Sequence, residues 1–375
     1  MPSRSENAGR GILESLGVNV GGSKPQDIKV HDQRFYDRVL SGGSLAMGES
    51  YMDGWWDANQ LDAFFTTILS NKDFREQAKK YWPAVLNAYA GKFLNRQGTQ
   101  RQSIESVHKH YDIGNDLYVA MLDKRMAYTC GYWKDATNVD EAQEAKFDLV
   151  CRKIGLEKGM TVLDLGCGWG CFAKFAAEKY GAKVLGVTVS KEQVALGTEM
   201  CQGLPVEIRL QDYRDSAGSY DRVVSIGLME HVGPKNYETL MKTIHRTLKD
   251  GGLGLVHTIG GNYSTTSIDP WIDKYIFPNA VLPSISQISK AMENLFVVED
   301  WHNFGADYDK TLMAWHENIS AKWSELDPNK YDERFRRMWD YYLLMCAGGF
   351  RSRMNQLWQV VISKEGVPGG YTTVR

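Results

Sequence analysis

The sequence predicts an α/β protein, with a doubly wound, mostly parallel sheet of seven strands and a small, mainly helical N-terminal domain. From about residue 105, short runs rich in β-branched residues alternate with helix-like runs, which is typical of a parallel sheet covered by helices. Residues 24–100 instead show apolar residues at mixed spacing with glycine breaks. The polar, glycine-containing stretch 91–103 indicates a linker. We therefore expect two domains, at 1–100 and 105–375.

The elements of the second domain are expected in a regular order. Stretch 138–156 places Val139, Ala142, Phe147, Val150 and Ile154 roughly on one helical face, so a helix should precede the first strand. The β-rich runs that follow are 161–165, 183–189, 206–210, 221–227, 252–260, 296–304 and 357–363. Helix-like runs at 171–181 and 190–200 separate the first of them. Because ligands of such sheets bind at the carboxyl ends of the strands, functional residues should follow strands.

Composition excludes several classes of function. Lys and Arg number 44 against 46 Asp and Glu, a net charge of -2, which does not favour a nucleic-acid partner. The six cysteines are scattered without paired C-x-x-C spacing, so we expect no metal site and reduced thiols. No stretch approaches the roughly 18 apolar residues of a membrane-spanning helix. These features predict a cytoplasmic protein that is at most peripheral to a membrane.

The stretch VLDLGCGWG at 162–170 is the first candidate ligand site. Gly166, Gly168 and Gly170 directly follow a predicted strand and precede a helix, where glycine lets the backbone turn sharply and approach a ligand. A lone G-x-G is found as often in a plain strand-to-helix turn as in a ligand-binding loop. A dinucleotide loop reads G-x-G-x-x-G with an acid about 20 residues further on. Here the third glycine comes too early and VTVS at 187–190 carries no acid, so we expect a ligand without a pyrophosphate.

The pattern D-x-G-x-G-x-G at 164–170 resembles the first motif of class I S-adenosylmethionine (SAM) methyltransferases. The resemblance implies that the glycine turn passes under the amino-acid part of SAM, which Asp164 orients. LQDYRD at 210–215 matches the place of adenine contacts, with Asp212 accepting from the amino group and Tyr213 packing on the ring. The usual ribose-binding acid is absent, so Thr188, Ser190 or Gln193 would replace it. The remaining SAM contacts implied by the resemblance are Tyr128, Thr129, Gly166, Cys167, Gly168 and Gln211.

Several motifs, in order along nearly the whole chain, carry a closer resemblance. They are GESYMDGWW (48–56), HKHYDIGNDLY (108–118), YTCGYW (128–133), IGLMEHVGPKNY (226–237), LVHTIG (255–260), DPWIDKYIFPN (269–279) and FGADYDKTLMAWHE (304–317). The chain resembles the bacterial cyclopropane-fatty-acyl-phospholipid synthases and, less closely, the mycolic acid cyclopropane synthases. The resemblance implies that the cis double bond of a phospholipid acyl chain attacks the SAM methyl group. A bound bicarbonate then removes a proton and the ring closes.

The same resemblance implies a catalytic site around bicarbonate. Its ligands would be Cys130, Glu230, His257, Ile259 through its backbone, and Tyr308. Two bare negative charges repel, so Glu230 would act through a shared proton or by orienting His257. His257 is expected to end the fifth strand. Aromatic faces and a fixed anion would stabilise the cation that develops on the acyl chain.

Cys346 has a different expected role. Phe335, Met338, Trp339, Tyr342, Leu343 and Cys346 fall at helical spacing and form one apolar face. A nucleophilic thiol needs an electropositive, accessible setting, and an alkene needs no protein nucleophile. We therefore interpret Cys346 as part of the acyl tunnel or core, near the site and not covalent.

The partners implied are an unsaturated phospholipid bilayer, at the inner face of the cell membrane, and a second copy in a homodimer. Stretch 329–353 carries Lys330, Arg334, Arg336, Arg337, Arg351 and Arg353 interleaved with aromatics, so it is a candidate lipid-facing surface. A solvated helix face explains it equally well. The N-terminal domain is the other candidate, for lipid docking or dimer contacts.

Three other functions remain open on the sequence. A methyltransferase of the same fold would act on a lipid or small molecule without a bicarbonate pocket. A nicotinamide oxidoreductase would need a later third glycine. A non-catalytic lipid-binding module would not need a complete SAM loop beside a polar constellation.

Overall fold

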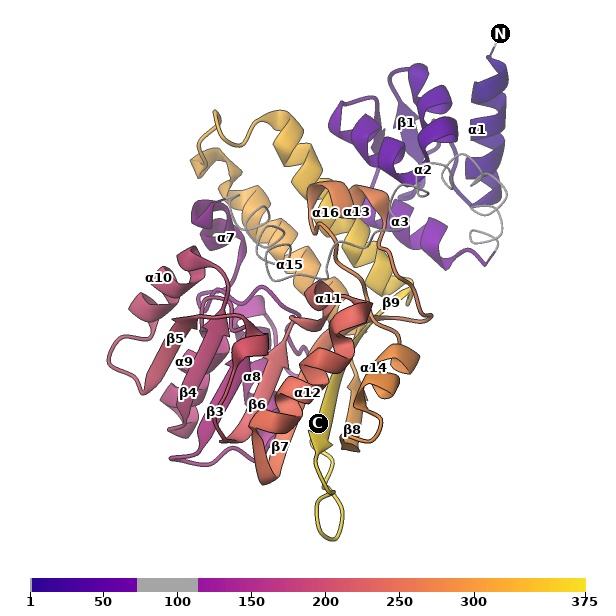
Figure 1. Cartoon of the computed structure of the whole chain (residues 1–375). Helices are drawn as coiled ribbons and strands as arrows, with labels where there is room; N and C mark the ends of the chain where they lie inside the picture. Colours follow the sequence, from indigo (N-terminus) through magenta and orange to yellow (C-terminus); the bar gives the residue numbers. More distant parts are fainter. Residues whose placement is uncertain (1, 73–113) are drawn as a thin grey trace. The chain divides into compact units, whose positions relative to one another are not determined.

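The structure is a computed structural model, and it describes residues 2–72 and 114–375 (Figure 1). It divides into two compact units. Unit 1 comprises the described residues of Met1–Asn95 with Ile268–Pro278 and Tyr308–Asn355; unit 2 comprises those of Arg96–Ser267 with Asn279–Asp307 and Gln356–Arg375. Unit 1 thus takes in segments far beyond residue 105. The expected linker at 91–103 lies outside the described residues, so the predicted boundary stays a prediction.

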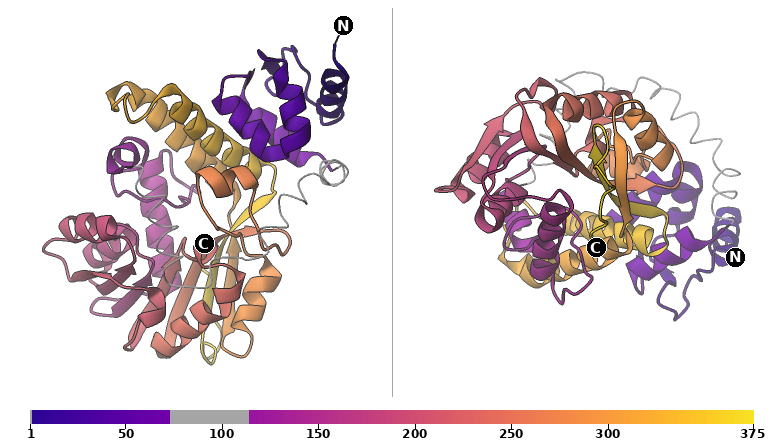
Figure 2. Two further views of the ribbon diagram at one scale, coloured as in Figure 1. Left: turned by 45° about the horizontal axis from the view of Figure 1, so that its top comes forward. Right: turned by 90° about the horizontal axis from the view of Figure 1, so that it is seen from below.

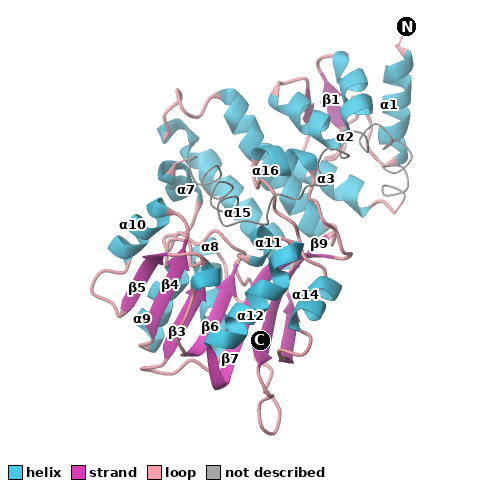
Figure 3. Ribbon diagram, in the orientation of Figure 1, coloured by secondary structure: helices cyan, strands magenta, loops and turns pink. Residues whose placement is uncertain are grey.

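The sheet of unit 2 confirms the predicted fold class. Among the described residues, seven strands form one sheet in the order β5-β4-β3-β6-β7-β9-β8 (Figures 1 and 3). Their bounds are β3 Thr161–Leu165, β4 Lys183–Thr188, β5 Val206–Leu210, β6 Tyr220–Ile226, β7 Leu248–Gly261, β8 Val297–Asn303 and β9 Asn355–Ser363. The pairs from β5 to β7 are parallel, whereas β8 and β9 are antiparallel.

The strand register positions the candidate site. Asp164 on β3 lies beside Gly186 on β4 and Val224 on β6. His257 on β7 pairs with Ile226, the last residue of β6. The prediction that His257 ends its own strand was wrong, because β7 continues past it to Gly261. His257 is still level with the carboxyl end of β6, which is where a ligand of a parallel sheet would bind.

Helices cover both faces of the sheet, as an alternating βα pattern requires. The helices in the described part of unit 2 are α7 Asn115–Met121, α8 Val139–Lys153, α9 Cys171–Tyr180, α10 Lys191–Met200, α11 Met229–Val232, α12 Tyr237–Thr247 and α14 Ile285–Met292, with short 3₁₀ turns η3 Tyr213–Asp215 and η4 Pro234–Asn236. Helix α8 begins where the sequence predicts a helix, because Asn138 caps it by accepting from the Glu141 N–H at 3.0 Å.

Two hydrophobic cores follow from the two-residue period of the strands. Val162, Val224 and Leu255 pack with α8 and α9 in one cluster. The neighbouring Leu163, Val223 and Val256 pack with α12 and α14 in the other cluster, on the opposite face. Figure 2 shows these layers from two further directions. The sheet is therefore buried on both sides, which leaves its strand ends as the place for a ligand.

Unit 1 is mainly helical. Its elements are α1 Arg4–Ser15, β1 Ile28–Val30, α2 Arg34–Met52, β2 Trp56–Ala58, α3 Leu61–Ser70, α13 Pro270–Tyr275, α15 Ala306–Lys322, η5 Trp323–Glu325 and α16 Glu333–Arg351. The sequence did not indicate the antiparallel pair β1–β2. Helix α16 packs closely on α3, since a Cβ at Gly348 would lie 2.6 Å from Cβ of Phe65.

Arginines of α16 are used inside unit 1. Arg337 donates to the carbonyls of Tyr51 and Trp56 and pairs with Asp57 at 2.7 Å. Two further arginines have the same character: Arg334 pairs with Asp53, and Arg351 pairs with both Asp62 and Asp309. Half of the basic side chains that suggested a lipid-facing surface thus hold unit 1 together. Within the described residues, no helix is long and apolar enough to cross a membrane.

Candidate active site

The glycine loop after β3 has the geometry of a ligand-binding turn. Gly166, Gly168 and Gly170 have φ angles of 75°, 57° and 78°, a region that L side chains rarely adopt. A Cβ at Gly168 would meet no atom within 4 Å, whereas one at Gly166 would press on Leu228 at 3.0 Å. The N–H groups of Gly166 and Cys167 both donate to the Val187 carbonyl at 3.0 Å, which fixes the loop to β4. The loop is therefore rigid and leaves open space at Gly168.

Asp164 lies near the end of β3, just before this loop, and its carboxyl group is buried. It is 1% exposed, and burial raises its pKa to about 7, against the attraction of the Lys146 ammonium. Among the described residues its Oδ1 atom has no hydrogen-bond partner. An unpartnered buried polar atom is costly unless a ligand satisfies it.

The three residues expected at the ribose form a compact buried cluster. The Thr188 hydroxyl donates to Oε1 of Gln193 at 2.6 Å. Ser190 caps α10 by accepting from the Gln193 N–H at 3.2 Å. These contacts place the three side chains together after β4, as expected, although each already has a partner within the cluster. Their role at the ribose stays a prediction.

Residues 210–215, which are expected at adenine, already make several contacts within the protein. Asp212 accepts from the Arg214 guanidinium at 2.8 and 2.7 Å, and the Gln211 N–H donates to the Thr188 carbonyl at 2.8 Å. Tyr213 belongs to the core cluster beneath α12, where burial raises its pKa to about 12. Core packing alone accounts for the Tyr213 ring, so its contact with adenine stays a prediction.

The YTCGYW segment is held by side chains that the sequence analysis missed. Gln143 of α8 donates to the Thr129 carbonyl at 2.7 Å, and Lys146, one turn later, donates to the Thr129 hydroxyl at 2.8 Å. Thr129 in turn contacts the end of β6, since a Cβ at Gly227 would lie 3.0 Å from its methyl group. Cys130 follows and is fully buried. Two polar residues inside the buried stripe of α8 were the available signal.

An aromatic cluster accompanies this segment. The ring of Tyr118, on α7, lies 5.2 Å from the rings of both Tyr128 and Trp169. Trp169 is part of the glycine loop. Tyr118 thus lies between Tyr128 and the glycine loop, and the role of Tyr128 at SAM stays a prediction.

Glu230 is held beside β7 through a hydrogen bond to one of its two carboxylate oxygens. The Ile259 N–H donates to its Oε1 at 2.6 Å, whereas Oε2 lacks a partner within the described part of the chain. Glu230 is 5% exposed, and burial raises its pKa to about 7 although the Ile259 N–H opposes the shift. The structure thus brings Glu230 and Ile259 together, as the sequence predicts. At neutral pH this carboxyl group can donate or accept a proton.

His257 is a neutral imidazole in a buried, partly aromatic setting. Burial lowers its pKa well below the usual value, with a smaller contribution from the ammonium groups of Lys146 and Lys153. The Gln359 amide nitrogen lies 3.2 Å from Nδ1, so Nδ1 accepts and the proton resides on Nε2. Nε2 has no partner in the described residues, and the Phe304 ring lies 5.9 Å from the imidazole. Gln359, on β9, was another residue that the sequence analysis missed.

Tyr308 and Cys346 belong to unit 1. The Tyr308 ring packs on Phe350 at 4.5 Å, so core packing accounts for part of its environment. Burial raises the pKa of the Cys346 thiol to about 12, which leaves almost no thiolate at neutral pH. This supports the interpretation that Cys346 forms no covalent bond, and both residues stay predicted members of the site.

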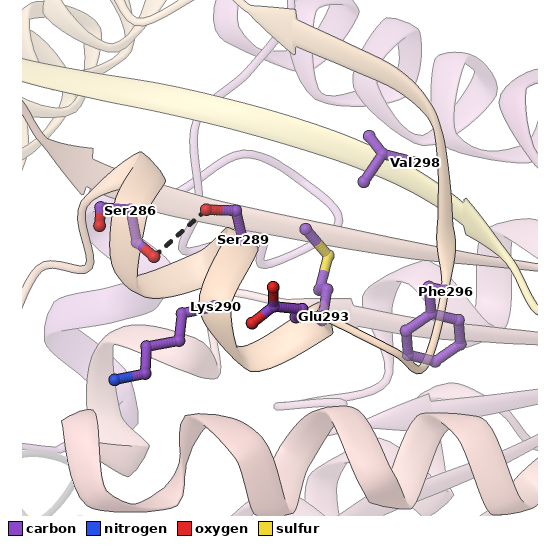
Figure 4. Close-up of a pocket in the computed structure, with 7 residues that line it drawn as sticks. Ser286, Ser289, Lys290, Glu293, Phe296 and Val298 are labelled. Carbon is purple, nitrogen blue, oxygen red and sulfur yellow. Dashed lines mark hydrogen bonds between the residues drawn. The ribbon is translucent and has the colours of Figure 1, made fainter.

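A groove on unit 2 lies outside the predicted site. It has a volume of about 340 Å³ between α14 and the start of β8, where Lys290, Phe296 and Val298 line it (Figure 4). No predicted site residue lines it, so the candidate site rests on the strand ends and not on this groove.

The sheet order and the glycine turn after β3 define the class I SAM-dependent methyltransferase fold. The family model described as mycolic acid cyclopropane synthetase matches residues 98–360. The chain is 50% identical over 364 residues to the cyclopropane-fatty-acyl-phospholipid synthase of Escherichia coli strain K12, covering 97% of this chain and 94% of that protein. It therefore belongs to the mycolic acid cyclopropane synthetase family, a family of SAM-dependent enzymes.

Two further comparisons agree. A probable fatty acid methyltransferase of Pseudomonas putida is 38% identical over 285 residues, which is 72% of this chain and 71% of that protein. A solved mycolic acid cyclopropane synthase, complexed with S-adenosylhomocysteine (SAH) and CTAB, superposes with a TM-score of 0.65 at 31% identity. That match covers 70% of this chain and 98% of the other.

Proposed function

We propose that this protein transfers a methylene group from SAM to the cis double bond of unsaturated acyl chains in membrane phospholipids, forming a cyclopropane ring. The observation that carries the proposal is the identity of 50% to the Escherichia coli synthase across nearly the full length of both chains. The buried polar groups at the strand ends support it, because they suit a reaction that excludes water.

The residues present fit SAM as co-substrate. The open space at Gly168 and the unpartnered Oδ1 of Asp164 lie at the same strand end, and Thr129 is held close to the end of the neighbouring β6. When bound, SAM would supply an electrophilic methyl group. The chain's part is to hold the acceptor alkene in line with it, since an alkene cannot be activated by removing a proton.

The residues also fit a small bound anion, for which we propose bicarbonate. Neutral His257 presents an Nε2–H donor, and Glu230 presents a carboxyl group that is protonated in part at neutral pH. Both groups are buried and lack partners for these atoms among the described residues. When bound, bicarbonate would supply the base for the proton that leaves the new methyl group. Cys130, Ile259 and Tyr308 complete the proposed ligand set.

A second candidate function is methyl branching of the acyl chain without ring closure. The matches to the probable fatty acid methyltransferase of Pseudomonas putida and to a tuberculostearic acid methyltransferase of Mycobacterium tuberculosis favour it. The latter is 31% identical over 351 residues. Both reactions need the SAM loop, so the product and not SAM binding separates them.

Product analysis with lipid vesicles tests the proposal. The purified protein is incubated with SAM carrying a ¹³C-methyl group and with vesicles of dioleoylphosphatidylglycerol, and acyl chains and head groups are analysed separately. We expect acyl chains heavier by one CH₂, without the alkene and with cyclopropane signals in the NMR spectrum. A methyl-branched chain supports the second candidate, and a methylated head group contradicts both.

Bicarbonate, membrane association and assembly need separate measurements. Removing dissolved CO₂ should lower the rate of ring formation, and added bicarbonate should restore it. Sedimentation with vesicles tests peripheral binding at the membrane surface where the substrate lies. Analytical ultracentrifugation tests the proposed homodimer, which rests on the family resemblance.

A further inference from the structure

Lys146 is a buried cation without a carboxylate partner. Its side chain is fully buried on α8, and its Nζ atom lies 2.8 Å from the Thr129 hydroxyl and 3.7 Å from the centre of the Phe147 ring. In residues 2–72 and 114–375 no carboxylate lies within ion-pairing distance of it. Taking an ammonium group out of water without a counter-charge is strongly unfavourable. Such a group is retained where it meets a negative charge during function.

The nearest acidic groups do not fill that place. Asp164 and Asp123 influence Lys146 only through space, and both are buried. Asp123 already accepts from the N–H groups of Arg125 and Ala127 at 2.9 and 2.8 Å. Asp164 keeps Oδ1 without a partner among the described residues. The strand end therefore carries an ammonium group and a carboxyl group that are near each other and not paired.

A ligand that carries both charges would satisfy both groups. The methionine end of SAM is such a zwitterion, with an α-carboxylate and an α-ammonium on one carbon atom. Burial lowers the pKa of Lys146 to about 8, so the ammonium form still predominates at neutral pH. Gln143 fixes the Thr129 main chain, which keeps the Thr129 hydroxyl beside the ammonium group.

We propose that Lys146 binds the α-carboxylate of SAM beside the Thr129 hydroxyl. Thr129 and Asp164 are SAM contacts that the family resemblance already implies, and Lys146 is the new member of this site. This deepens the proposed function, because it rests on SAM as the co-substrate. Lys146 becomes a binding residue for one end of the ligand and contributes nothing to the adenosine end. That asymmetry makes it measurable without turnover.

Isothermal titration calorimetry with two ligands tests the proposal. SAH carries the amino-acid end, whereas 5′-methylthioadenosine shares the nucleoside and the thioether but lacks that end. Lys146→Met should lower the affinity for SAH by about 10- to 100-fold, the range for a lost hydrogen bond to a charged group, and leave the affinity for methylthioadenosine within about twofold. Lys146→Gln keeps a donor for Thr129 without the charge and should lose SAH affinity in the same way.

Lys153→Met is the matched control. Lys153 is also a fully buried lysine of α8, but it pairs with Asp300 at 3.3 Å, so its loss should lower stability without changing the ratio of the two affinities. The proposal is overturned if Lys146→Met lowers the affinities for SAH and methylthioadenosine equally. It is also overturned if the variant has a normal thermal melt and an unchanged affinity for SAH. Absence of SAH binding to the wild-type protein would instead contradict the proposed function.

Discussion

At the scale of single residues, the candidate site combines ionisable side chains with very low exposure to solvent. Glu230 and His257 are each less than a tenth exposed. Burial raises the pKa of Glu230 and lowers that of His257, so the neutral form of each side chain is favoured. A neutral pair can donate to an anion without adding charge to an apolar site. Each group therefore has a consequence for stability or catalysis that can be measured separately.

Glu230→Gln should change how stability depends on pH. The pKa of Glu230 rises from 4.5 to about 7 on folding, so between these values the folded state holds more protons and wild-type stability falls as pH rises. Gln does not titrate. The free energy of unfolding of Glu230→Gln minus that of the wild type should increase by up to about 3 kcal/mol between pH 5 and pH 8, because the wild type alone loses stability. Urea unfolding at each pH measures this difference.

Glu238→Gln is the control for this trend, because Glu238 lies exposed on α12, where it pairs with Lys242. A difference between Glu230→Gln and wild type that stays constant with pH would contradict the assigned burial effect.

Gln359→Leu should impair catalysis and not co-substrate binding. Without the amide, no described group fixes the proton of His257 on Nε2, so the donor for the proposed anion is lost part of the time. We expect the rate of ring formation to fall at least about tenfold, which is less than the roughly 10²- to 10⁴-fold that a positioned acid–base group itself contributes. SAH affinity by calorimetry should stay within about twofold, since general acid–base groups act on the reacting atoms.

Gln356→Leu, on the same strand, removes an amide that bonds Asn303 and Asn262, so it should cost stability and leave the rate per folded molecule unchanged. Equal rate losses in both variants would speak against the positioning role of Gln359.

The sequence predicted part of the site and missed another part for a physical reason. The glycine loop, Asp164 and the Thr188 cluster lie within short stretches after strands, so their neighbourhood is local in sequence. Gln359 meets His257 only because β9 inserts next to β7, which no local pattern reveals. Lys146 could have been noticed, because a lysine inside an otherwise buried helical stripe needs a partner.

At the scale of elements, local patterns predicted strands better than pairings. The runs 161–165 and 206–210 coincide with β3 and β5, and four of the other five lie within two residues of the observed bounds. Strand β7 is longer than expected because it begins at Leu248, four residues before the predicted run 252–260. The three-residue strands β1 and β2 are too short for a two-residue period to show.

Arg337 should be the main polar contact of α16 with the N-terminal elements. Arg337→Ala removes the guanidinium donor to the carbonyls of Tyr51 and Trp56 and removes the pair with Asp57, although the Tyr51 carbonyl keeps the Gly54 N–H at 2.9 Å. We expect a loss of about 2–3 kcal/mol in the free energy of unfolding. Arg336→Ala, one residue away and paired with Glu333 only at 3.8 Å, should cost less than about 0.5 kcal/mol. Similar losses in both variants would contradict this assignment, and chemical unfolding measures them.

At the scale of the whole molecule, the chain passes back and forth between the two units, and each unit is built from three segments. The chain passes from one unit to the other after Ser267, Pro278, Asp307 and Asn355. Unit 1 is thus completed by segments whose ends are held in unit 2. Unfolding one unit releases the anchors of the other.

We therefore expect the units to unfold together. Differential scanning calorimetry should show one transition, and SAH should shift all of it upward, by about 3 kcal/mol of stability at a hundred times its Kd. Two resolved transitions, of which SAH moves only one, would show that the units are independent.

The interleaved chain also limits how such an enzyme can be recombined. A chimera that replaces only the N-terminal 72 residues with those of a relative would set a foreign α3 against the native α16, where Gly348 leaves no room for a different side-chain arrangement around Phe65. The N-terminal helices, α13 and α16 would have to be exchanged as one set. Evolution of the first segment is therefore tied to changes more than 200 residues further along the chain, between Ile268 and Asn355.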